Sequence, residues 1–230
     1  MTNVERASAE RLEARTPLTR ERVLRAAVEL ADAEGLEALS MRRLAQALGV
    51  EAMSLYYYVA SKDELRADMV GLIQAEIVFP HTGDWKADLR GGAMAARDAL
   101  IRHPWAAGLV QSVGPSPARL AFMEAVLGTL RGAGLSAAQT DHAYHAIDCH
   151  ITGFTLWQSA FPFRTDEELA ELAGAFRQTL SADDFPYLLE HIDEHIEPSD
   201  AEEVSEFAFG LDLILDGVER MLPSVTTNLG

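Results

Sequence analysis

Four copies of the S/T-x-x-E/Q capping box restrict the fold of this chain more than any other feature. In this motif the first and fourth side chains satisfy free backbone donors at the start of a helix. The copies are Ser61–Glu64, Ser136–Gln139, Thr165–Glu168 and Ser199–Glu202. Each opens a segment in which apolar residues recur with helical spacing, and no alternating Val/Ile/Thr run indicates a strand. The sequence therefore predicts an all-α fold with nine or ten helices.

The residue totals limit the class of protein. The 230 residues are 48% hydrophobic, which is typical of one or two globular domains with a buried core. Cys149 is the single cysteine, so no intramolecular disulfide can form, as is usual in a reducing cytosol. The polar N-terminus has no signal region, and no apolar run reaches the roughly 18 residues of a membrane span. We expect a cytoplasmic protein with no membrane partner.

The net charge of −17 is spread unevenly along the chain. Residues 1–70 hold 10 basic and 12 acidic residues, whereas residues 71–230 hold 9 basic and 24 acidic residues. A surface that binds an anion such as nucleic acid is therefore expected near the N-terminus. The acidic remainder suits a solubility surface.

The stretch LSMRRLAQALGVEAMSLYYYV, residues 39–59, indicates two short helices around a sharp turn. Ser40 can cap the first helix, and Gly49 permits the turn because glycine adopts positive φ at no steric cost. A helix that begins at Thr19 precedes the pair, and the capped helix at Ser61, which we expect to reach about Phe79, follows it. Two short helices with this spacing predict a helix-turn-helix.

Three consecutive tyrosines on the second helix need an explanation. Each residue turns a helix by about 100°, so a single core cannot bury Tyr56, Tyr57 and Tyr58 together. The helical wheel places Tyr57 and Met53 on the outer face, which in this motif lies in the major groove of DNA. A phenol offers an apolar surface to a thymine methyl and a hydroxyl to a phosphate. We interpret the tyrosines as DNA contacts; the alternative is packing against the neighbouring domain, above all for Tyr58.

The segment from Leu39 to Met69 resembles the DNA-binding domain of the TetR family of bacterial transcriptional regulators. The segments DWKADLRGGAMAARDALIRHP and FAFGLDLILDGVERML are similar to a ligand-domain helix and the last dimerisation helix of the tetracycline-repressor branch. The resemblance implies a homodimeric repressor that binds a palindromic DNA operator and is released by a small-molecule effector. It implies neither enzyme activity nor a cofactor.

This resemblance, together with the composition, divides the chain into three parts. Residues 1–17 are expected to form a mobile arm, residues 18–66 the helix-turn-helix DNA-binding domain, and residues 67–230 a ligand-binding and dimerisation domain. The positions that match the family's DNA contacts are Ser40, Met41, Arg42, Ala52, Met53, Ser54, Tyr56, Tyr57, Tyr58 and Lys62. Ala52 and Met53 have no hydrogen-bonding side chain, so the operator should differ from the tetracycline operator.

The tetracycline site of that branch is not retained. Gly91–Gly92 and Ala96 stand where the branch has an asparagine and a phenylalanine for the drug. No histidine follows the HP turn to bind a metal, and Gln111 is the polar residue of that region. We therefore do not expect recognition of a drug–magnesium complex, and no metal site is predicted.

Two long helices, expected from Ser136 to Phe161 and from Ser199 to Met221, carry apolar residues at the seam spacing of packed helices. Two such helices from each of two chains would form a four-helix bundle. The predicted dimer-interface residues are Tyr144, Ile147, Ile151, Phe207, Leu211, Ile214 and Val218. The alternative is that they belong to a core within one chain. Gly210 and Gly217 would permit close approach of the helices.

Large apolar side chains and a few polar ones mark the candidate effector pocket, although each could equally be plain core. The candidates are Met94, His103, Trp105, Gln111, Met123, His150, Phe154, Trp157 and Phe161.

Two alternatives to a ligand-responsive regulator remain open. His145 and Cys149 lie four residues apart, as do His191 and His195, and this spacing suits a metal or a thiol–histidine pair. A metal-assisted enzyme with a vestigial DNA-binding head would depend on His145 and Cys149. The other alternative is a DNA-binding dimer that a partner protein controls through the acidic domain.

Overall fold

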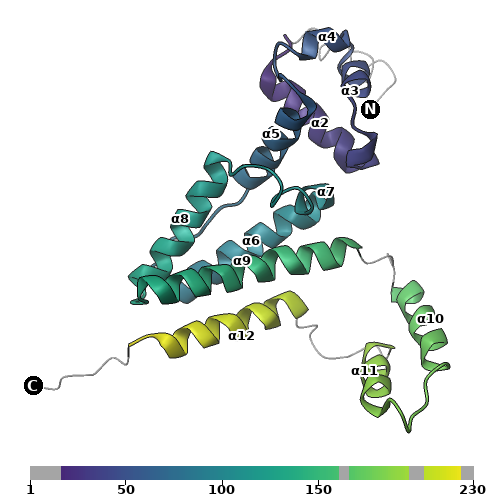
Figure 1. The fold of residues 1–230 in the computed structure, drawn as a ribbon, viewed down its shortest axis with the longest axis vertical. Coiled ribbons are helices and arrows are strands. Elements are labelled where there is room, and N and C mark those ends of the chain that lie inside the picture. The colour runs from purple at the N-terminus through teal and green to yellow at the C-terminus, as the bar shows by residue number, and fades with distance from the viewer. Residues whose placement is uncertain (1–16, 161–165, 197–204, 224–230) are drawn as a thin grey trace, which may run out of the picture.

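The computed structural model describes residues 17–160, 166–196 and 205–223, which form eleven α-helices, one 3₁₀-helix and no strand (Figure 1). This confirms the all-α prediction, but the count exceeds nine or ten because two of the helices have only four residues. One of these, α7 (Pro104–Ala107), begins at Pro104, which occupies the first helical position, where its missing N–H costs nothing.

The first five elements form a small N-terminal unit, called the head below. They are α2 (Arg20–Glu34), η1 (Leu36–Ala38), α3 (Met41–Leu48), α4 (Ala52–Leu55) and α5 (Lys62–Ala75). They enclose one hydrophobic cluster built on residues such as Val23, Leu44 and Leu55, each 0% exposed. As predicted, Thr19 caps α2: its Oγ1 accepts a hydrogen bond from Arg22 N at 3.2 Å.

The remaining helices form a larger unit, called the body below. They are α6 (Trp85–Arg102), α7 (Pro104–Ala107), α8 (Pro117–Gly132), α9 (Ala137–Ala160), α10 (Asp166–Arg177), α11 (Pro186–Ile196) and α12 (Glu206–Met221). Helix α9 lies at its centre and contacts α6, α7, α8 and α12 (Figure 1). Helices α10 and α11 pack on each other as a hairpin beside this core.

Helix α5 belongs to both units. Leu65 and Met69 are buried in the head cluster, whereas Ile73, one turn further on, is buried in the body cluster. The predicted boundary between residues 66 and 67 therefore falls inside one continuous helix. This helix was expected to reach about Phe79, but it ends at Ala75 because the chain turns back to lay Phe79 and Pro80 on α6.

Two of the four capping boxes lie within the described residues. Ser136 and Gln139 form the reciprocal pair: Ser136 N donates to Gln139 Oε1 at 2.9 Å, and Gln139 N donates to Ser136 Oγ at 3.3 Å. At the other box, Ser61 Oγ accepts a hydrogen bond from Glu64 N at 3.0 Å. The Glu64 carboxylate, however, accepts from Ala60 N and not from Ser61 N. The boxes at Thr165 and Ser199 lie outside the described residues, as do the predicted arm and Phe161.

Candidate functional site

The turn between α3 and α4 has the predicted geometry. Ser40 caps α3, its Oγ accepting a hydrogen bond from Arg43 N at 3.2 Å. Gly49 ends the helix in the left-handed region, at φ 68° and ψ 31°. Val50 N donates to Ala45 O at 3.0 Å, which closes the turn and sets α4 across α3. The two short helices therefore form the expected helix-turn-helix.

The three tyrosines lie at the end of α4 rather than within it. The α-helix ends at Leu55. A tighter turn follows, in which the hydrogen bond spans three residues: Tyr58 N donates to Leu55 O at 2.9 Å. The outward placement of Tyr57 is confirmed, since it is 91% exposed, and Met53 beside it is 72% exposed. Tyr56 is 46% exposed, whereas Tyr58 packs against the core cluster of its own head and not, as the alternative interpretation had it, against the neighbouring domain.

The other residues predicted to contact DNA surround this face. Arg42 is exposed near the start of α3 and forms no ion pair with any described residue, whereas its neighbour Arg43 pairs with Glu34. Lys62 is half-buried at the first position of α5. The remaining members are also half-buried: Ser40, Met41, Ala52 and Ser54.

Arg20 holds this face in place, a role that the sequence did not reveal. Its Nε donates to Tyr58 O at 3.2 Å, and its Nη2 contacts Glu64 at 3.1 Å and Asp68 at 2.5 Å. The Arg20 guanidinium on α2 therefore contacts both α5 and the turn that carries Tyr58. No local signal marks it, because its partners lie 38, 44 and 48 residues away.

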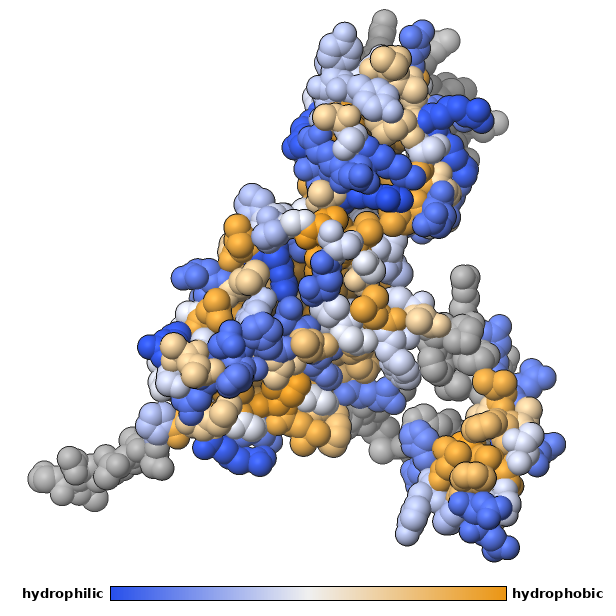
Figure 2. Space-filling view, in the orientation of Figure 1, coloured by the Kyte–Doolittle hydropathy of each residue, from blue (hydrophilic) through white to orange (hydrophobic). Residues whose placement is uncertain are grey.

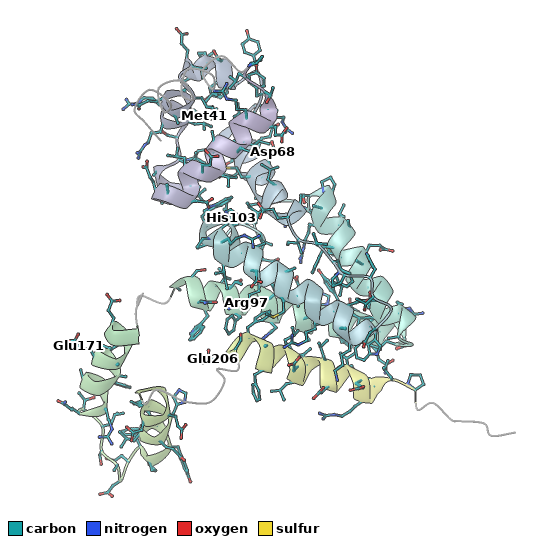
Figure 3. All side chains as sticks on the ribbon, turned by 180° about the vertical axis from the view of Figure 1, so that it is seen from behind. Met41, Asp68, Arg97, His103, Glu171 and Glu206 are labelled. Atoms are coloured by element: carbon teal, nitrogen blue, oxygen red, sulfur yellow. The ribbon has the colours of Figure 1, made fainter. Side chains whose placement is uncertain are left out.

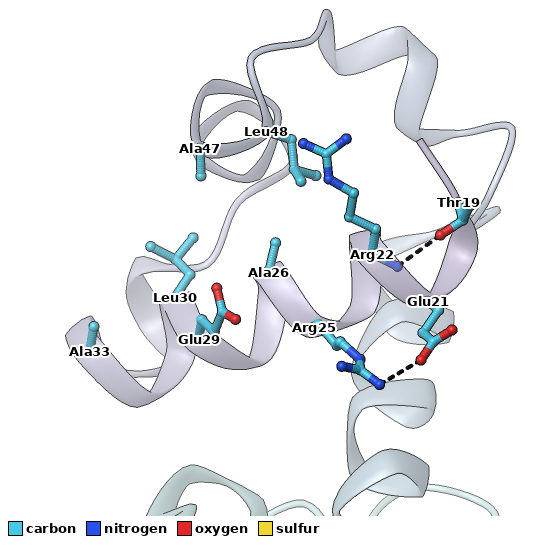
Figure 4. Close-up of a pocket in the computed structure, with 10 residues that line it drawn as sticks. All are labelled: Thr19, Glu21, Arg22, Arg25, Ala26, Glu29, Leu30, Ala33, Ala47 and Leu48. Atoms are coloured by element: carbon cyan, nitrogen blue, oxygen red, sulfur yellow. Dashed lines mark hydrogen bonds and ion pairs between the residues drawn. The ribbon is translucent and has the colours of Figure 1, made fainter. Parts of the chain in front are cut away.

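A hollow of about 680 Å³ lies on the flank of the head between α2 and α3 (Figure 4). Arg25 and Glu21 form an ion pair at its rim, and Arg22 points toward Leu48 across it. It is open to solvent and mixes charges of both signs. Such an open surface does not enclose a ligand.

The body contains a small, partly enclosed cavity of about 20 Å³ between α5, α6, α8 and α9. Its lining residues are Gln74, Ile77, Ala96, Leu100, Val110, Arg119, Phe122, Asp148, Ile151 and Thr152. None of the nine pocket candidates is among them, so the sequence did not point to this cavity, and the effector pocket inferred from the sequence stays a prediction. The available signal was Arg119 and Asp148, two charges within otherwise apolar helical stretches, but only the fold shows that they meet.

Eight of the nine candidates lie within the described structure, where they make other contacts. Met94, Trp105, Met123 and Phe154 pack around the body cluster, and the ring of His150 stacks on Phe207 at 4.7 Å. Gln111 is exposed, and Trp157 is 51% exposed.

His103 and Trp105 form a latch between the body and the head (Figure 3). Asp32 of α2 accepts a hydrogen bond from His103 Nδ1 at 2.8 Å and from Trp105 Nε1 at 2.6 Å. Because an ionised carboxylate only accepts, Nδ1 must carry the proton. His103 also lies 3.7 Å from Glu76 through Nε2. The end of α6 and the start of α7 are thereby fastened to the head.

The predicted dimer residues form the contact between α9 and α12 within one chain. Tyr144, Ile147, Ile151, Phe207, Leu211 and Val218 are buried in the body cluster, and Ile214 packs against it. The six buried side chains are not available to a second chain, so the alternative of an intramolecular core is correct for them, whereas Ile214 is only half-buried. Gly210 does permit close approach, but of α12 to His150 of α9 in the same chain.

Other apolar side chains on the same two helices are uncovered. Phe209 and Leu213 of α12 are 60% and 56% exposed, and Leu156 of α9 is 41% exposed. Figure 2 shows apolar surface along α12 and over the α10–α11 hairpin. On the hairpin it includes Leu172 and Phe176.

The histidine and cysteine groupings do not assemble a site among the described residues. Cys149 is exposed, and His145 Nδ1 bonds to Asp141 O of its own helix at 2.8 Å. No group of three or more His, Cys, Asp or Glu side chains in the described part of the chain could hold a metal. None of the described helices is both long and apolar enough to cross a membrane.

Two family models match the chain. The model for bacterial regulatory proteins of the tetR family covers residues 23–69, and the tetracyclin repressor-like C-terminal domain covers residues 79–222. The first match spans most of the head, and the second spans nearly all of the described body.

Individual relatives agree with these matches. The HTH-type transcriptional repressor DrrR1 of Streptomyces coeruleorubidus is 36% identical over 89% of this chain and 78% of its own length. The tetracycline repressor protein class C of Escherichia coli is 33% identical over 92% of this chain and 94% of its own. The structure of ActR from Streptomyces coelicolor in complex with actinorhodin superposes with a TM-score of 0.74 at 28% identity, covering 89% of this chain and 98% of that one.

Proposed function

The chain belongs to the TetR family of bacterial regulatory proteins, and from this premise we propose that it is a ligand-responsive transcriptional repressor. As a homodimer in the cytoplasm it binds a palindromic operator in double-stranded DNA, and a small molecule bound in the body releases it. The observation that carries this proposal is the uncovered face of Met53 and Tyr57 at the end of the helix-turn-helix. Large apolar surfaces of this kind mark interaction sites.

The chemistry of this face suits the major groove. Tyr57 and Met53 offer apolar contacts to thymine methyl groups, and Arg42, which is free of any described ion pair, can donate to a guanine edge. Lys62 and the N-terminal amides of α5 are placed to meet the phosphate backbone. Phosphate contacts fix position and base contacts give sequence selectivity.

A second copy of the chain is the proposed cover for the apolar surface of α9 and α12. Phe209, Leu213 and Leu156 would then be buried across a two-fold axis, as self-complementary patches are in most homodimers. Two heads related by that axis would read two half-sites of a palindrome. The uncovered apolar side chains of the hairpin support the same arrangement.

The position of the cavity supports a route from the effector to the DNA. Gln74 lies on α5 and lines the cavity, and the same helix carries Leu65 and Met69 of the head core. A ligand that enlarges the cavity must push against α5 and so shift the head. Such a ligand favours a spacing of the two heads that does not fit the operator. The structure of ActR in complex with actinorhodin, a member of the same family, supports a small molecule as the effector.

Fluorescence anisotropy of the full chain on duplexes tiled across its own upstream region tests the proposal. We expect nanomolar, site-selective binding that weakens steeply with salt, with a log–log slope of roughly 0.9 for each neutralised phosphate. Sedimentation of the complex should give two chains for each palindrome. Uniform weak binding to every duplex, including scrambled ones, would contradict a sequence-specific regulator.

A further inference from the structure

Met53 is the most exposed methionine in the described part of the chain. It is 72% exposed on α4, whereas Met221, the next most exposed, reaches 39% at the end of α12. The other described methionines pack in or against one of the two hydrophobic clusters, and Met69 among them is 0% exposed. The thioether of Met53 is therefore the described one that a dissolved oxidant reaches most easily.

The packing of α4 keeps Met53 at the surface. Leu55, two residues further along the helix, is 0% exposed in the head cluster, so α4 cannot turn Met53 inward without uncovering Leu55. Tyr57, which follows α4, is 91% exposed. The thioether thus lies on the face of the head that is proposed to contact DNA.

Oxidation by hydrogen peroxide changes the character of a thioether. The sulfur lone pair attacks one peroxide oxygen, an S–O bond forms and the O–O bond breaks. The hydroxide that leaves takes the proton of the transferred oxygen and becomes water. The sulfur is oxidised by two electrons and the peroxide is reduced by two. The product, methionine sulfoxide, is polar, and reductases specific for its two epimers return it to methionine.

A sulfoxide at position 53 does not suit the surface that the thioether is proposed to contact. The thioether offers an apolar contact to a thymine methyl group. The sulfoxide oxygen would lose its hydration beside that methyl group, or would face phosphate oxygens, which are acceptors themselves. A homodimer carries one such residue in each head, so the loss applies at both half-sites.

We propose that Met53 is a reversible oxidation site through which peroxide releases the regulator from its operator. Peroxide oxidises Met53 in the free protein, the sulfoxide lowers the affinity for the operator, and methionine sulfoxide reductases restore it. This route acts on the head directly and does not use the cavity of the body. It rests on the proposed function, because it regulates the DNA-contacting face of that regulator.

Hydrogen peroxide treatment of the full-length protein, followed by fluorescence anisotropy on the selected operator, tests this proposal. The affinity of the wild type should fall at least about tenfold, and the reductases should restore it. Peptide mass spectrometry should find one added oxygen on Met53 before any appears on Met221. Bound operator should slow the oxidation of Met53 but not that of Met221, because only Met53 lies on the DNA-contacting face.

Met53→Leu removes the sulfur and keeps a similar apolar volume. Its affinity after treatment is compared with its own untreated value, which peroxide should change less than about twofold. Met221→Leu and Cys149→Ser are the matched controls, since both residues are exposed but lie on α12 and α9. Both controls should respond to peroxide as the wild type does. If Met53→Leu does not bind the operator, the wild type still decides, through loss and repair of affinity in step with the Met53 sulfoxide.

Three results would overturn the inference: full operator affinity with Met53 oxidised, a peroxide response that survives in Met53→Leu, or a response that disappears in Cys149→Ser. Operator binding by the untreated protein, measured first, reports on the proposed function alone. Site-selective binding without a peroxide response at Met53 refutes only the oxidation site. Absence of site-selective binding before treatment refutes the regulator, and this route of regulation with it.

Discussion

At the scale of single residues, two glycines of α6 show what a missing side chain does. Gly91 and Gly92 stand where the tetracycline branch has a drug-binding side chain, and the sequence alone indicated only that this group is lost. In the structure Phe79 and Pro80 occupy the space: a Cβ on Gly91 would lie 2.7 Å from Pro80 Cγ, and one on Gly92 would overlap the ring of Phe79. Because both positions lack a side chain, the loop between α5 and α6 can pack directly against α6.

Gly92→Ala should lower the free energy of unfolding by about 1–3 kcal/mol, because the new methyl group must displace a packed aromatic ring. Chemical denaturation followed by circular dichroism measures this. Gly128→Ala is the matched control, since Gly128 is also inside a helix but has nothing within 4 Å of an added Cβ. It should be neutral or stabilising by up to about 1 kcal/mol. Equal effects of both changes would argue against the close contact.

The sequence predicted the conformation and exposure of residues that depend on local geometry. It did not predict the roles of residues that depend on tertiary contacts. Gly49 has its positive φ and Tyr57 is exposed, because turn chemistry and helical spacing are local properties. The roles of Arg20 and Arg119 were missed, because their partners are distant in the sequence. Aromatic size was a poor guide to the cavity, since most large rings are needed to fill the core.

At the scale of secondary-structure elements, the turn before α6 is stabilised by one buried carboxylate. Asp88 accepts hydrogen bonds from Thr82 N at 2.8 Å, from Thr82 Oγ1 at 2.7 Å and from Gly83 N at 3.3 Å. The bond from the Thr82 backbone, followed by that from its hydroxyl, lowers the pKa of Asp88 below its ordinary value of 3.8. The folded protein therefore stabilises the ionised form of Asp88.

The lowered pKa of Asp88 makes the stability of the fold depend on pH. A lowered folded-state pKa gives stability that is present above the ordinary value of 3.8 and lost as the pH falls through the folded pKa. Asp88→Asn should therefore melt at a lower temperature than the wild type at pH 7, with a smaller difference near pH 3. Thermal melts across this range measure it, with Asp63→Asn, whose side chain is 95% exposed, as the control. A difference that does not change with pH would contradict this account.

The latch between α2 and the start of α7 gives a second test at this scale. Asp32→Ala removes the carboxylate that accepts hydrogen bonds from His103 and Trp105, so the ring N–H groups of both residues lose this partner. We expect about 1–3 kcal/mol less protection of the α2 amides in hydrogen exchange. Glu29→Ala, an exposed acid on the same helix, should leave the exchange unchanged. Unaltered protection in Asp32→Ala would show that the latch does not couple the head to the body.

Helix positions in the described chain could largely be predicted, because caps and apolar spacing specify them. The expected helix from Ser136 to Phe161 corresponds closely to α9, Ala137–Ala160. The end of α5 was misplaced because the docking of Phe79 on Gly92 is a tertiary contact. The seam spacing of Phe207, Leu211 and Val218 was read correctly as helix packing, but spacing alone does not say which chain supplies the partner helix.

At the scale of the whole molecule, the proposed dimer depends on the outer face of α12. Leu213→Asp should weaken the dimer at least about 100-fold, because an unpaired charge would be buried at its centre. Sedimentation equilibrium measures the change. Leu120→Asp, on α8 at 52% exposure, is a matched control and should leave the dimer intact. A Leu213→Asp protein that remains dimeric would place the interface elsewhere.

The most direct test of the central claim compares Tyr57→Ala with the wild type on the selected operator and on a scrambled duplex. If Tyr57 reads a base, the change should cost roughly 1–3 kcal/mol on the operator and little on the scrambled duplex. Tyr187→Ala is the matched control, since Tyr187 is 83% exposed but lies on α11. Full operator affinity and selectivity in Tyr57→Ala would contradict the assignment of this face as the DNA-reading surface.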